Sequence, residues 1–278
     1  MVTVKDVSVE RIDKDSEPIW RRSARVHHDL WVNGNEVWML TRAPRLVPLV
    51  HAKSPTLVDS ITVLDLDTGE FIREIDLLEV LLNSPFRGLL PNVALSELGG
   101  GAEIDIIHTN HVEVFDGDLE HLSPLFRAGN MLISMRQTSA VAILNPDKLS
   151  IEWLWGPSNV VFKHHPTLTR EGTILLFDNG LKQSRVVEVD PRNNQIVWQY
   201  TDSKFFSELR GSVQRLPNGN TLVTESDTGH VLEVTVDGER VWEFATPHFD
   251  SRANGRRYGE RCVTRKNNCL SCSRPREA

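Results

Sequence analysis

The chain has 278 residues, of which 40% are hydrophobic, and a formal net charge of −7; this length permits one large all-β domain or two ordinary domains. Residues 251–278 carry +6, so the remainder carries −13, a sign that speaks against nucleic-acid binding by the main fold. No apolar stretch approaches the ~18 residues needed to span a membrane. The N-terminus also lacks the pattern of a signal peptide, so we expect a soluble, cytoplasmic chain without a membrane-spanning segment.

A phrase that ends on Trp recurs along the chain. It is an acidic or polar turn followed by a β-branched run, and it ends at Trp20, Trp153, Trp198 and Trp242, the last three spaced 45 and 44 residues apart. A further copy, residues 63–69, keeps the turn but has Arg73 in place of Trp. A period in the forties with several short strands per unit is typical of β-propeller blades. We interpret each Trp as a packing residue between adjacent sheets.

A second phrase opens the units with a polar turn that contains glycine and leads into an apolar strand. It occurs at residues 32–38, 128–133, 171–176 and 218–223. Asn-Gly is a strong hairpin signal, because a type I′ turn needs positive φ at both central residues. The two phrases together predict an all-β propeller of about five to six four-stranded antiparallel blades, each of about 45 residues.

Three stretches depart from the repeat. Residues 1–22 resemble only the outer half of a blade, so we expect either closure by C-terminal strands or a ring that lacks blades. Residues 78–104 read as an insertion with a short helical pattern. The propeller is assigned to residues 1–246, and residues 247–278 form a basic tail with Cys262, Cys269 and Cys272 that we expect to be disordered. The C-x-x-C pair lacks a full ligand set, so no metal site is predicted.

Histidines lie at the expected start of three innermost strands. His27 and His28 precede the first inner hairpin, and His108 follows Asp105. His164 and His165 open the hairpin that contains residues 171–176. Innermost strands face the central channel, so these side chains can converge although they are far apart in sequence. Arg136 and Arg185 follow inner hairpins and can point the same way. Any single histidine here is more often a structural residue, which is how we interpret His51, His121 and His230.

Imidazole beside guanidinium suits one kind of chemistry. Arginine presents a planar fork of donors that fits a tetrahedral oxyanion. Neutral histidine can act as a nucleophile or pass a proton to a leaving oxygen near pH 7. The histidines and arginines at the starts of the innermost strands therefore favour a site that binds an oxyanion.

These residues resemble the bacterial, PAPS-independent arylsulfotransferases and their propeller relatives. The resemblance rests on five motifs in the family's order: residues 27–35, 105–110, 134–137, 151–156 and 165–185, with residues 214–222 also typical. The family mechanism is ping-pong: a channel histidine takes the sulfuryl group from an aryl sulfate and passes it to a phenol, without a cofactor. Characterised members are often exported.

The resemblance implies catalytic roles for His28, His108 and His165, with either Arg185 or Arg136 as the oxyanion-binding arginine. Arg136, Asn110 and Asn179 are assigned to substrate binding. The family's nucleophile lies late in the chain, where His230 and His248 match no motif, so the nucleophile stays open. Two alternatives also stay open: a non-catalytic propeller that retains an anion pocket, and a metal-dependent hydrolase or lactonase, for which the blade starts offer too few oxygen ligands.

Overall fold

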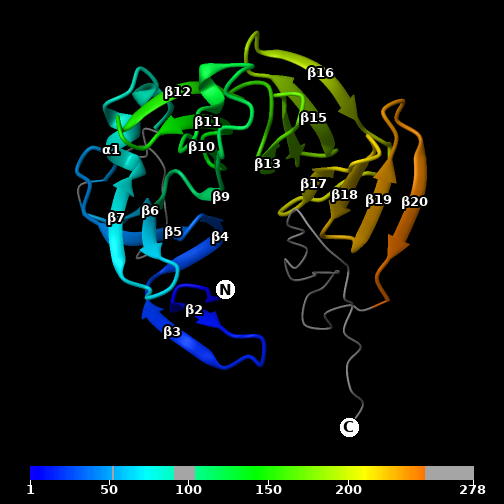
Figure 1. Cartoon of the computed structure of the whole chain (residues 1–278). Coiled ribbons are helices and arrows are strands. Elements are labelled where there is room, and N and C mark those ends of the chain that lie inside the picture. The colour runs from blue at the N-terminus through cyan, green and yellow to red at the C-terminus, as the bar shows by residue number, and fades with distance from the viewer. Residues whose placement is uncertain (52, 91–103, 248–278) are drawn as a thin grey trace.

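The computed structural model describes residues 1–51, 53–90 and 104–247, and it confirms the all-β propeller (Figure 1). The first sheet has the order β1-β2-β3 and the next the order β4-β5-β6-β7, to which β8 adds in parallel beside β6. Three four-stranded antiparallel sheets follow in chain order, β9 to β12, β13 to β16 and β17 to β20. The strands β4, β9, β13 and β17 line the centre, and the last strand of each sheet lies at the periphery (Figure 1).

The strands of the first two sheets are Val2–Val4 (β1), Ser8–Ile12 (β2), Pro18–Ser23 (β3), Val26–Asn33 (β4), Glu36–Arg45 (β5), Thr56–Asp65 (β6), Phe71–Asp76 (β7) and Ile104–Asp105 (β8). The other sheets comprise Thr109–Val114 (β9), Met131–Met135 (β10), Ala140–Asn145 (β11), Ser150–Trp155 (β12), His164–Leu168 (β13), Ile174–Asp178 (β14), Arg185–Asp190 (β15), Gln195–Tyr200 (β16), Ser212–Arg215 (β17), Thr221–Glu225 (β18), His230–Val234 (β19) and Arg240–Ala245 (β20).

The helical pattern predicted after the second unit forms one short α-helix, Leu77–Leu82 (α1). Asp76 caps it by accepting a hydrogen bond from the Glu79 N–H at 3.0 Å, and Leu77, Leu78, Val80 and Leu81 are buried. Two 3₁₀ turns lie at Arg87–Leu89 and Pro124–Phe126. Residues 91–103 of the predicted insertion and residues 248–278 of the basic tail, with its three cysteines, lie outside the described residues. No described helix has the length and apolarity that a membrane crossing needs.

The predicted glycine turns join the first and second strands of four sheets. Gly34, Gly129, Gly172 and Gly219 have φ values of +56°, +84°, +74° and +88°. Such left-handed values strain any residue with a Cβ atom, which explains glycine at this point of the repeat. The turn sets the register of each inner hairpin and hence the height at which the innermost strand begins.

The repeated Trp residues bond each sheet to the following one. Trp20 Nε1 donates to Leu66 O at 2.9 Å, Trp153 Nε1 to Asn194 Oδ1 at 2.8 Å and Trp198 Nε1 to Val236 O at 2.7 Å. Every acceptor lies in the turn that precedes the outermost strand of the following sheet. The interpretation of Trp as a residue between adjacent sheets is therefore confirmed for Trp20, Trp153 and Trp198, but it is wrong for Trp242, which is 49% exposed on the last sheet.

Arg73 occupies the same place on β7, and its guanidinium also bonds to the following sheet. Arg73 Nη1 lies 2.9 Å from Asp147 Oδ1, in the turn between β11 and β12, while Cζ stacks 4.8 Å from the centroid of Trp38. An arginine thus replaces the indole N–H at one seam of the repeat, with an ion pair in place of a neutral hydrogen bond.

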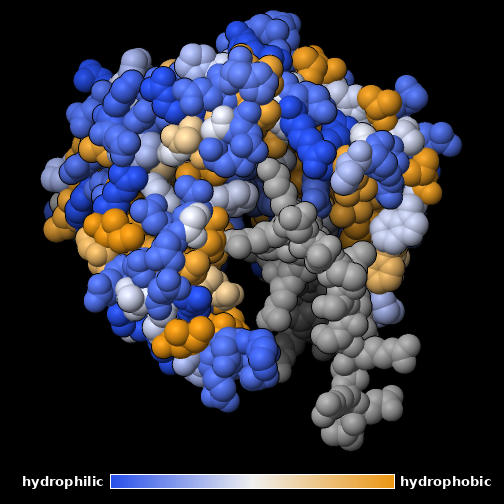
Figure 2. All heavy atoms as spheres, viewed as in Figure 1, coloured by the Kyte–Doolittle hydropathy of each residue, from blue (hydrophilic) through white to orange (hydrophobic). Residues whose placement is uncertain are grey.

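The hydrophobic core lies in the seams between sheets. One cluster joins the sheets that contain β9 and β13 through Ile143, Trp153, Ile174 and Val187, and others fill the seams on either side. Each sheet buries its faces against its neighbours, as expected for a repeat fold. The exterior in Figure 2 is mostly hydrophilic, with scattered hydrophobic side chains.

The first and last sheets differ from the others. β1 has one described partner, β2, and no strand of the C-terminal sheet pairs with it among the described residues. Every residue of β20 is exposed, and Trp242 is 49% exposed. The described chain therefore shows a sequence of sheets around a centre without hydrogen-bonded closure between the two ends.

Candidate functional site

Three predicted histidines share an unusual backbone conformation. His28, His108 and His165 have φ values of +55°, +53° and +47°, a region that is sparsely populated by residues other than glycine. Each lies at the start of an innermost strand, and the β4 and β13 pairings shift register there. Backbone strain of this kind costs of order 1–3 kcal/mol per residue and persists where surrounding structure fixes it. The starts of the inner strands are thus a strained and specifically shaped part of the fold.

His28 and His108 meet as predicted, within a chain of histidines. His108 Nε2 lies 3.2 Å from His28 Nε2, and His28 Nδ1 lies 2.8 Å from His27 Nδ1. Asp105 Oδ2 lies 2.5 Å from His108 Nδ1 at one end, and Thr41 O lies 3.3 Å from His27 Nε2 at the other. The chain therefore begins at a carboxylate and ends at a backbone carbonyl, both of which only accept hydrogen bonds.

The number of protons in this chain follows from its contacts. Four nitrogen contacts each need one proton to be hydrogen bonds, but three neutral imidazoles supply only three. Burial lowers the pKa of His27 to about 4 and, with the charge of His108, lowers that of His28 further. The four contacts are therefore all hydrogen bonds only when the chain holds one additional proton.

A second carboxylate borders the histidine chain on the side of His27. Asp59 Oδ1 lies 3.6 Å from His27 Nε2, and Asp59 Oδ2 accepts a 2.6 Å hydrogen bond from the Thr109 N–H. Burial raises the pKa of Asp59 to about 6 in spite of that hydrogen bond. Asp59 thus links the second sheet to the first residue of β9, next to His108.

His165 belongs to a separate cluster. Its Nδ1 lies 3.0 Å from Val213 O, and its ring centroid lies 5.2 Å from that of His111. His111 Nδ1 lies 2.8 Å from Asp29 Oδ2. Burial alone would raise the pKa of Asp29, but the contact with His111 outweighs it and lowers that pKa. An ionised carboxylate therefore lies on the side of His165.

Two cations lie near the first cluster. Arg136 is held by its backbone, whose N–H donates to His108 O at 3.0 Å, and its Cζ stacks 4.4 Å from the centroid of Phe162. Its guanidinium makes no hydrogen bond or ion pair with a described residue. Lys163 is fully buried and donates through Nζ to Met135 O; burial lowers its pKa well below the usual value. Arg136 is therefore the cation that keeps its donors available.

His164 is held by an oriented amide. Asn179 Nδ2 donates to Ser207 O at 2.7 Å and to Arg210 O at 3.0 Å, which turns Asn179 Oδ1 toward His164 Nδ1, 2.7 Å away. His164 must then carry its proton on Nδ1. Burial lowers the pKa of His164 to about 4, and the charges of Arg136 and Lys163 act in the same direction.

The other predicted site residues lie in different surroundings. Arg185 Nε is bound to Asp178 Oδ2 at 2.8 Å, and its remaining donors bond to Gln199 and Asn159. Asn110 Nδ2 donates to Lys163 O at 3.0 Å, so this amide positions the start of β13. His230 pairs with Glu243 at 2.7 Å, and His248 lies outside the described residues.

Sequence reasoning overlooked several members of these clusters. His111, Asp29, Asp59 and Lys163 were not predicted, although His111 and Asp29 each lie within three residues of a predicted histidine. The sequence did contain a signal for them. Side chains alternate between the two faces of an inner strand, so a polar residue just after the first residue of that strand faces the neighbouring sheet. Among the described residues, no group of three or more His, Cys, Asp or Glu side chains is arranged to hold a metal ion.

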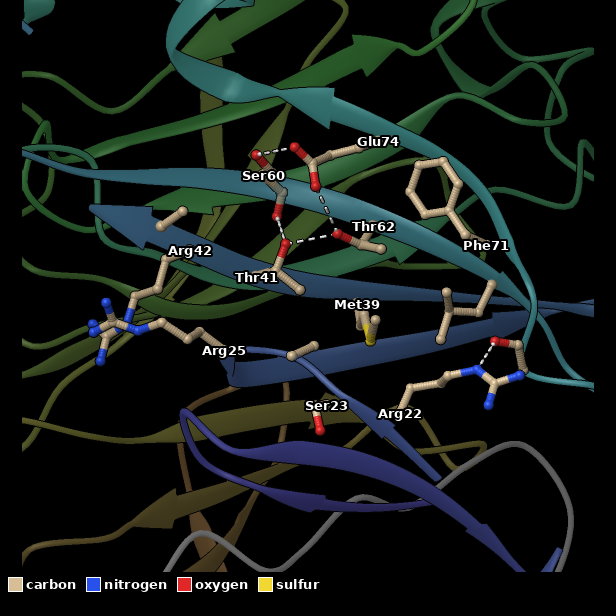
Figure 3. Close-up of a pocket in the computed structure, with 14 residues that line it drawn as sticks. Arg22, Ser23, Arg25, Met39, Thr41, Arg42, Ser60, Thr62, Phe71 and Glu74 are labelled. Carbon is tan, nitrogen blue, oxygen red and sulfur yellow. Dashed lines mark hydrogen bonds between the residues drawn. The ribbon is translucent and has the colours of Figure 1, made fainter. Parts of the chain in front are cut away.

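A pocket of about 370 Å³ lies at the seam between β3 and the sheet of β4 to β7 (Figure 3). Its polar side chains are engaged with protein: Arg42 binds Asp6 through two hydrogen bonds and Arg22 binds Gly69 O. Thr41 and Thr62 bond to one another, and Thr62 bonds to Glu74. The pocket borders the histidine chain through Thr41 but presents no free oxyanion-binding donors comparable to Arg136.

The comparison with known families identifies the family of the chain. The sequence profile described as Arylsulfotransferase (ASST) matches residues 6–247, which is most of the chain. The chain belongs to the arylsulfotransferase family. None of the curated proteins compared with it matches.

Solved structures similar to this arylsulfotransferase-family chain share its fold at low identity. A catalytically inactive variant of virginiamycin B lyase from Staphylococcus aureus, solved with quinupristin, is 12% identical with a TM-score of 0.51, over 87% of this chain and 64% of that one. A streptogramin B lyase is 12% identical with a TM-score of 0.50, over 87% and 63%. The Dos1 propeller is 12% identical with a TM-score of 0.49, over 88% and 55%. In each case this chain spans less than two thirds of the other, and identities this low show the fold alone.

Proposed function

We propose that this protein transfers a sulfuryl group from an aryl sulfate to a phenol through a histidine intermediate, without a cofactor. Membership of the arylsulfotransferase family supports sulfuryl transfer in general. The observation that carries the finer proposal is that histidines from the starts of β4, β9 and β13 lie together with Arg136, whose guanidinium is unpaired among the described residues.

Arg136 binds the oxygens of the sulfuryl group in this proposal. The sequence left this role between Arg136 and Arg185, and the occupied donors of Arg185 favour Arg136. A guanidinium forms two parallel hydrogen bonds to a tetrahedral oxyanion. Negative charge shifts among the oxygens as sulfur changes partners, and fixed donors in a buried site stabilise it most strongly.

His108 supplies the proton that the leaving phenolate takes up. It lies between Asp105 and His28, and the contacts of its chain are satisfied when one additional proton is present. Asp105 holds the His108 ring through Nδ1 and so orients it for this transfer. In the second half-reaction the neutral chain accepts the proton of the incoming phenol.

The test is a sulfuryl-transfer assay with 4-nitrophenyl sulfate as donor and a second phenol as acceptor. We expect acceptor-dependent release of 4-nitrophenol by the wild-type protein. His108→Ala should lower that release by roughly 10²–10⁴-fold, the usual range for loss of a general acid–base group. His121→Ala, a change in an exposed turn, is the matched control.

Two outcomes would contradict the proposal. The first is the absence of phenol release from folded wild-type protein, with or without acceptor. The second is equal activity of the His108→Ala and His121→Ala variants. Sulfate that bound Arg136 without turnover would instead support the non-catalytic propeller with a retained anion pocket.

A further inference from the structure

We propose that His164 Nε2 is the nucleophile that carries the sulfuryl group, and that Asn179 is the residue that positions it and fixes its tautomer. This inference rests on the proposed sulfuryl transfer. The nucleophile must offer a lone pair that no protein donor occupies, in surroundings that tolerate an anion. The described histidines of the two clusters differ sharply in both respects.

The histidine chain offers no free lone pair. His28 uses Nδ1 toward His27 and Nε2 toward His108, so both of its nitrogens are engaged. His108 uses Nδ1 toward Asp105 and Nε2 toward His28. His27 is engaged by His28 and Thr41 O. These three residues can relay a proton, but attack on sulfur would first require the chain to break.

The second cluster has the wrong electrostatic surroundings. His111 Nε2 is enclosed without a partner, so a substrate does not reach it. His165 donates from Nδ1 to Val213 O and thus keeps a lone pair on Nε2. Its neighbour is the Asp29–His111 pair, however, and the ionised Asp29 carboxylate repels the anionic group of an aryl sulfate.

His164 meets both requirements. Asn179 accepts the proton of Nδ1, which leaves the lone pair on Nε2. This Nε2 atom has no hydrogen-bond partner among the described residues, and it is not enclosed in the way that His111 Nε2 is. The positive charge of Arg136 acts on His164, so its surroundings attract an anion.

The residue before His164 is fixed through both its side chain and its backbone. Lys163 donates through Nζ to Met135 O, and its own carbonyl accepts from Asn110 Nδ2 at 3.0 Å. Both contacts join β13 to the sheet of β9 to β12, which also positions His108 and Arg136. The nucleophile, the anion-binding guanidinium and the proton donor are therefore held by one seam between two sheets.

The sulfuryl group moves in two half-reactions, first to His164 and then to the acceptor phenol. The Nε2 lone pair forms the N–S bond while the S–O bond to the aryl group breaks, and the phenolate oxygen leaves with that electron pair and takes the proton from His108. His164 then carries a sulfuryl group on Nε2 and a proton on Nδ1. The oxygen of the acceptor phenol next forms an S–O bond, the N–S electron pair returns to Nε2, and the phenol proton passes to His108.

The amide of Asn179 keeps this intermediate reactive. A sulfurylated imidazole that retains its Nδ1 proton has a positively charged ring, and it is a good leaving group because it departs as neutral imidazole. A carboxylate in the place of Asn179 would draw that proton away and stabilise the intermediate, whereas an amide oxygen only accepts the hydrogen bond. The contrast with His108, which is paired with the Asp105 carboxylate, separates a nucleophile from a proton carrier.

The experiment traps the intermediate. Wild-type protein is mixed with 4-nitrophenyl sulfate without acceptor, quenched in base and digested, and peptide mass spectrometry locates an added SO₃ group. We expect the adduct on His164. His164→Gln should form no adduct and should lose turnover by on the order of 10³-fold or more, while His121→Gln, a matched control in an exposed turn, should still form it.

Further variants test the roles separately. Imidazole added to His164→Gly should restore phenol release, because the free base can occupy the vacated space. Asn179→Asp should lengthen the lifetime of the adduct relative to wild type. If Asn179→Asp fails to fold, the rescue of His164→Gly still decides the assignment of the nucleophile.

The outcomes distinguish the two proposals. An adduct on His165, His108 or His28 would overturn the assignment of His164 and leave sulfuryl transfer intact. Turnover without any trapped adduct, together with undiminished activity of His164→Gln, would overturn it as well. Absence of phenol release from wild-type protein would instead overturn the proposed function itself.

Discussion

The innermost and outermost strands of the same sheets follow opposite rules. On the outer strands one contact recurs, since Trp20, Trp153 and Trp198 all donate to the turn of the following sheet. On the inner strands the starting histidines share a backbone conformation but not their partners. His28 contacts two other histidines, His108 faces a carboxylate, and His165 faces a backbone carbonyl.

This difference separates assembly from chemistry. A contact that stabilises successive seams can repeat with little change, because an indole or, at one seam, the Arg73 guanidinium reaches the same turn of the following sheet. An active site cannot be built from identical copies, because nucleophile, acid and anion-binding group need different electrostatic surroundings. The repeat is therefore uniform at the rim and diversified at the centre.

The largest expected effect concerns the two arginines. Arg136→Ala should lower kcat/KM for 4-nitrophenyl sulfate by roughly 10²–10³-fold, the usual cost of losing an oxyanion donor. Arg185→Ala should change kcat/KM far less and lower stability, since its guanidinium holds Asp178. Steady-state kinetics and denaturation of both variants measure this, and a larger kinetic effect at Arg185 would reverse the assignment.

The next effect is the loss of stability in mild acid. Burial lowers the pKa of His27, His164 and His165 to about 4, against about 6.5 in an unfolded chain. Between these values the unfolded state binds protons that the folded state excludes, so stability falls as pH falls. Asp59, with its pKa raised to about 6, opposes this in part.

The free energy of unfolding should therefore fall by about 1–3 kcal/mol as the pH is lowered from 6 to 5. Urea denaturation across this range measures it. His164→Gln and His165→Gln should each flatten the slope, because each removes one of the excluded protons. A stability that did not change from pH 7 to 5 would mean that these rings are protonated in the folded state.

A smaller effect concerns the rim. Trp153→Phe removes the 2.8 Å hydrogen bond to Asn194 and should cost about 1 kcal/mol beyond the loss of packing. Trp242→Phe should change stability less, because Trp242 is half exposed and makes no indole hydrogen bond to a described residue. Equal costs at the two positions would show that the repeated hydrogen bond contributes nothing to the seam.

The smallest effect concerns the arginine seam. Asp147→Ala removes the ion pair with Arg73, whose two side chains are 83% and 37% exposed. Exposed pairs contribute about 0–1 kcal/mol and are weakened by salt. Denaturation in low and high salt should therefore show a small difference from wild type that vanishes in high salt, in contrast to Trp153→Phe.

The repeated features of the rim could be predicted from the sequence, whereas the hydrogen-bond partners of the central histidines could not. The glycine turns and the Trp positions were predicted because each depends on local conformation and recurs. The starts of β4, β9 and β13 were also located correctly from their histidines. The hydrogen-bond partners were not, because Asp59 meets Thr109 across 50 residues and Asn179 depends on Ser207 and Arg210 carbonyls. A sequence period cannot reveal contacts that do not repeat.

In each indole contact at the rim, the donor is synthesised before its acceptor. Their acceptors lie 46, 41 and 38 residues downstream in the chain. During synthesis each Trp therefore leaves the ribosome before the turn to which it donates. At about 5–20 residues per second each seam stays unfinished for roughly 2–9 s. The three indole contacts thus become possible in order from the N-terminus, and each must wait until the following sheet has been made.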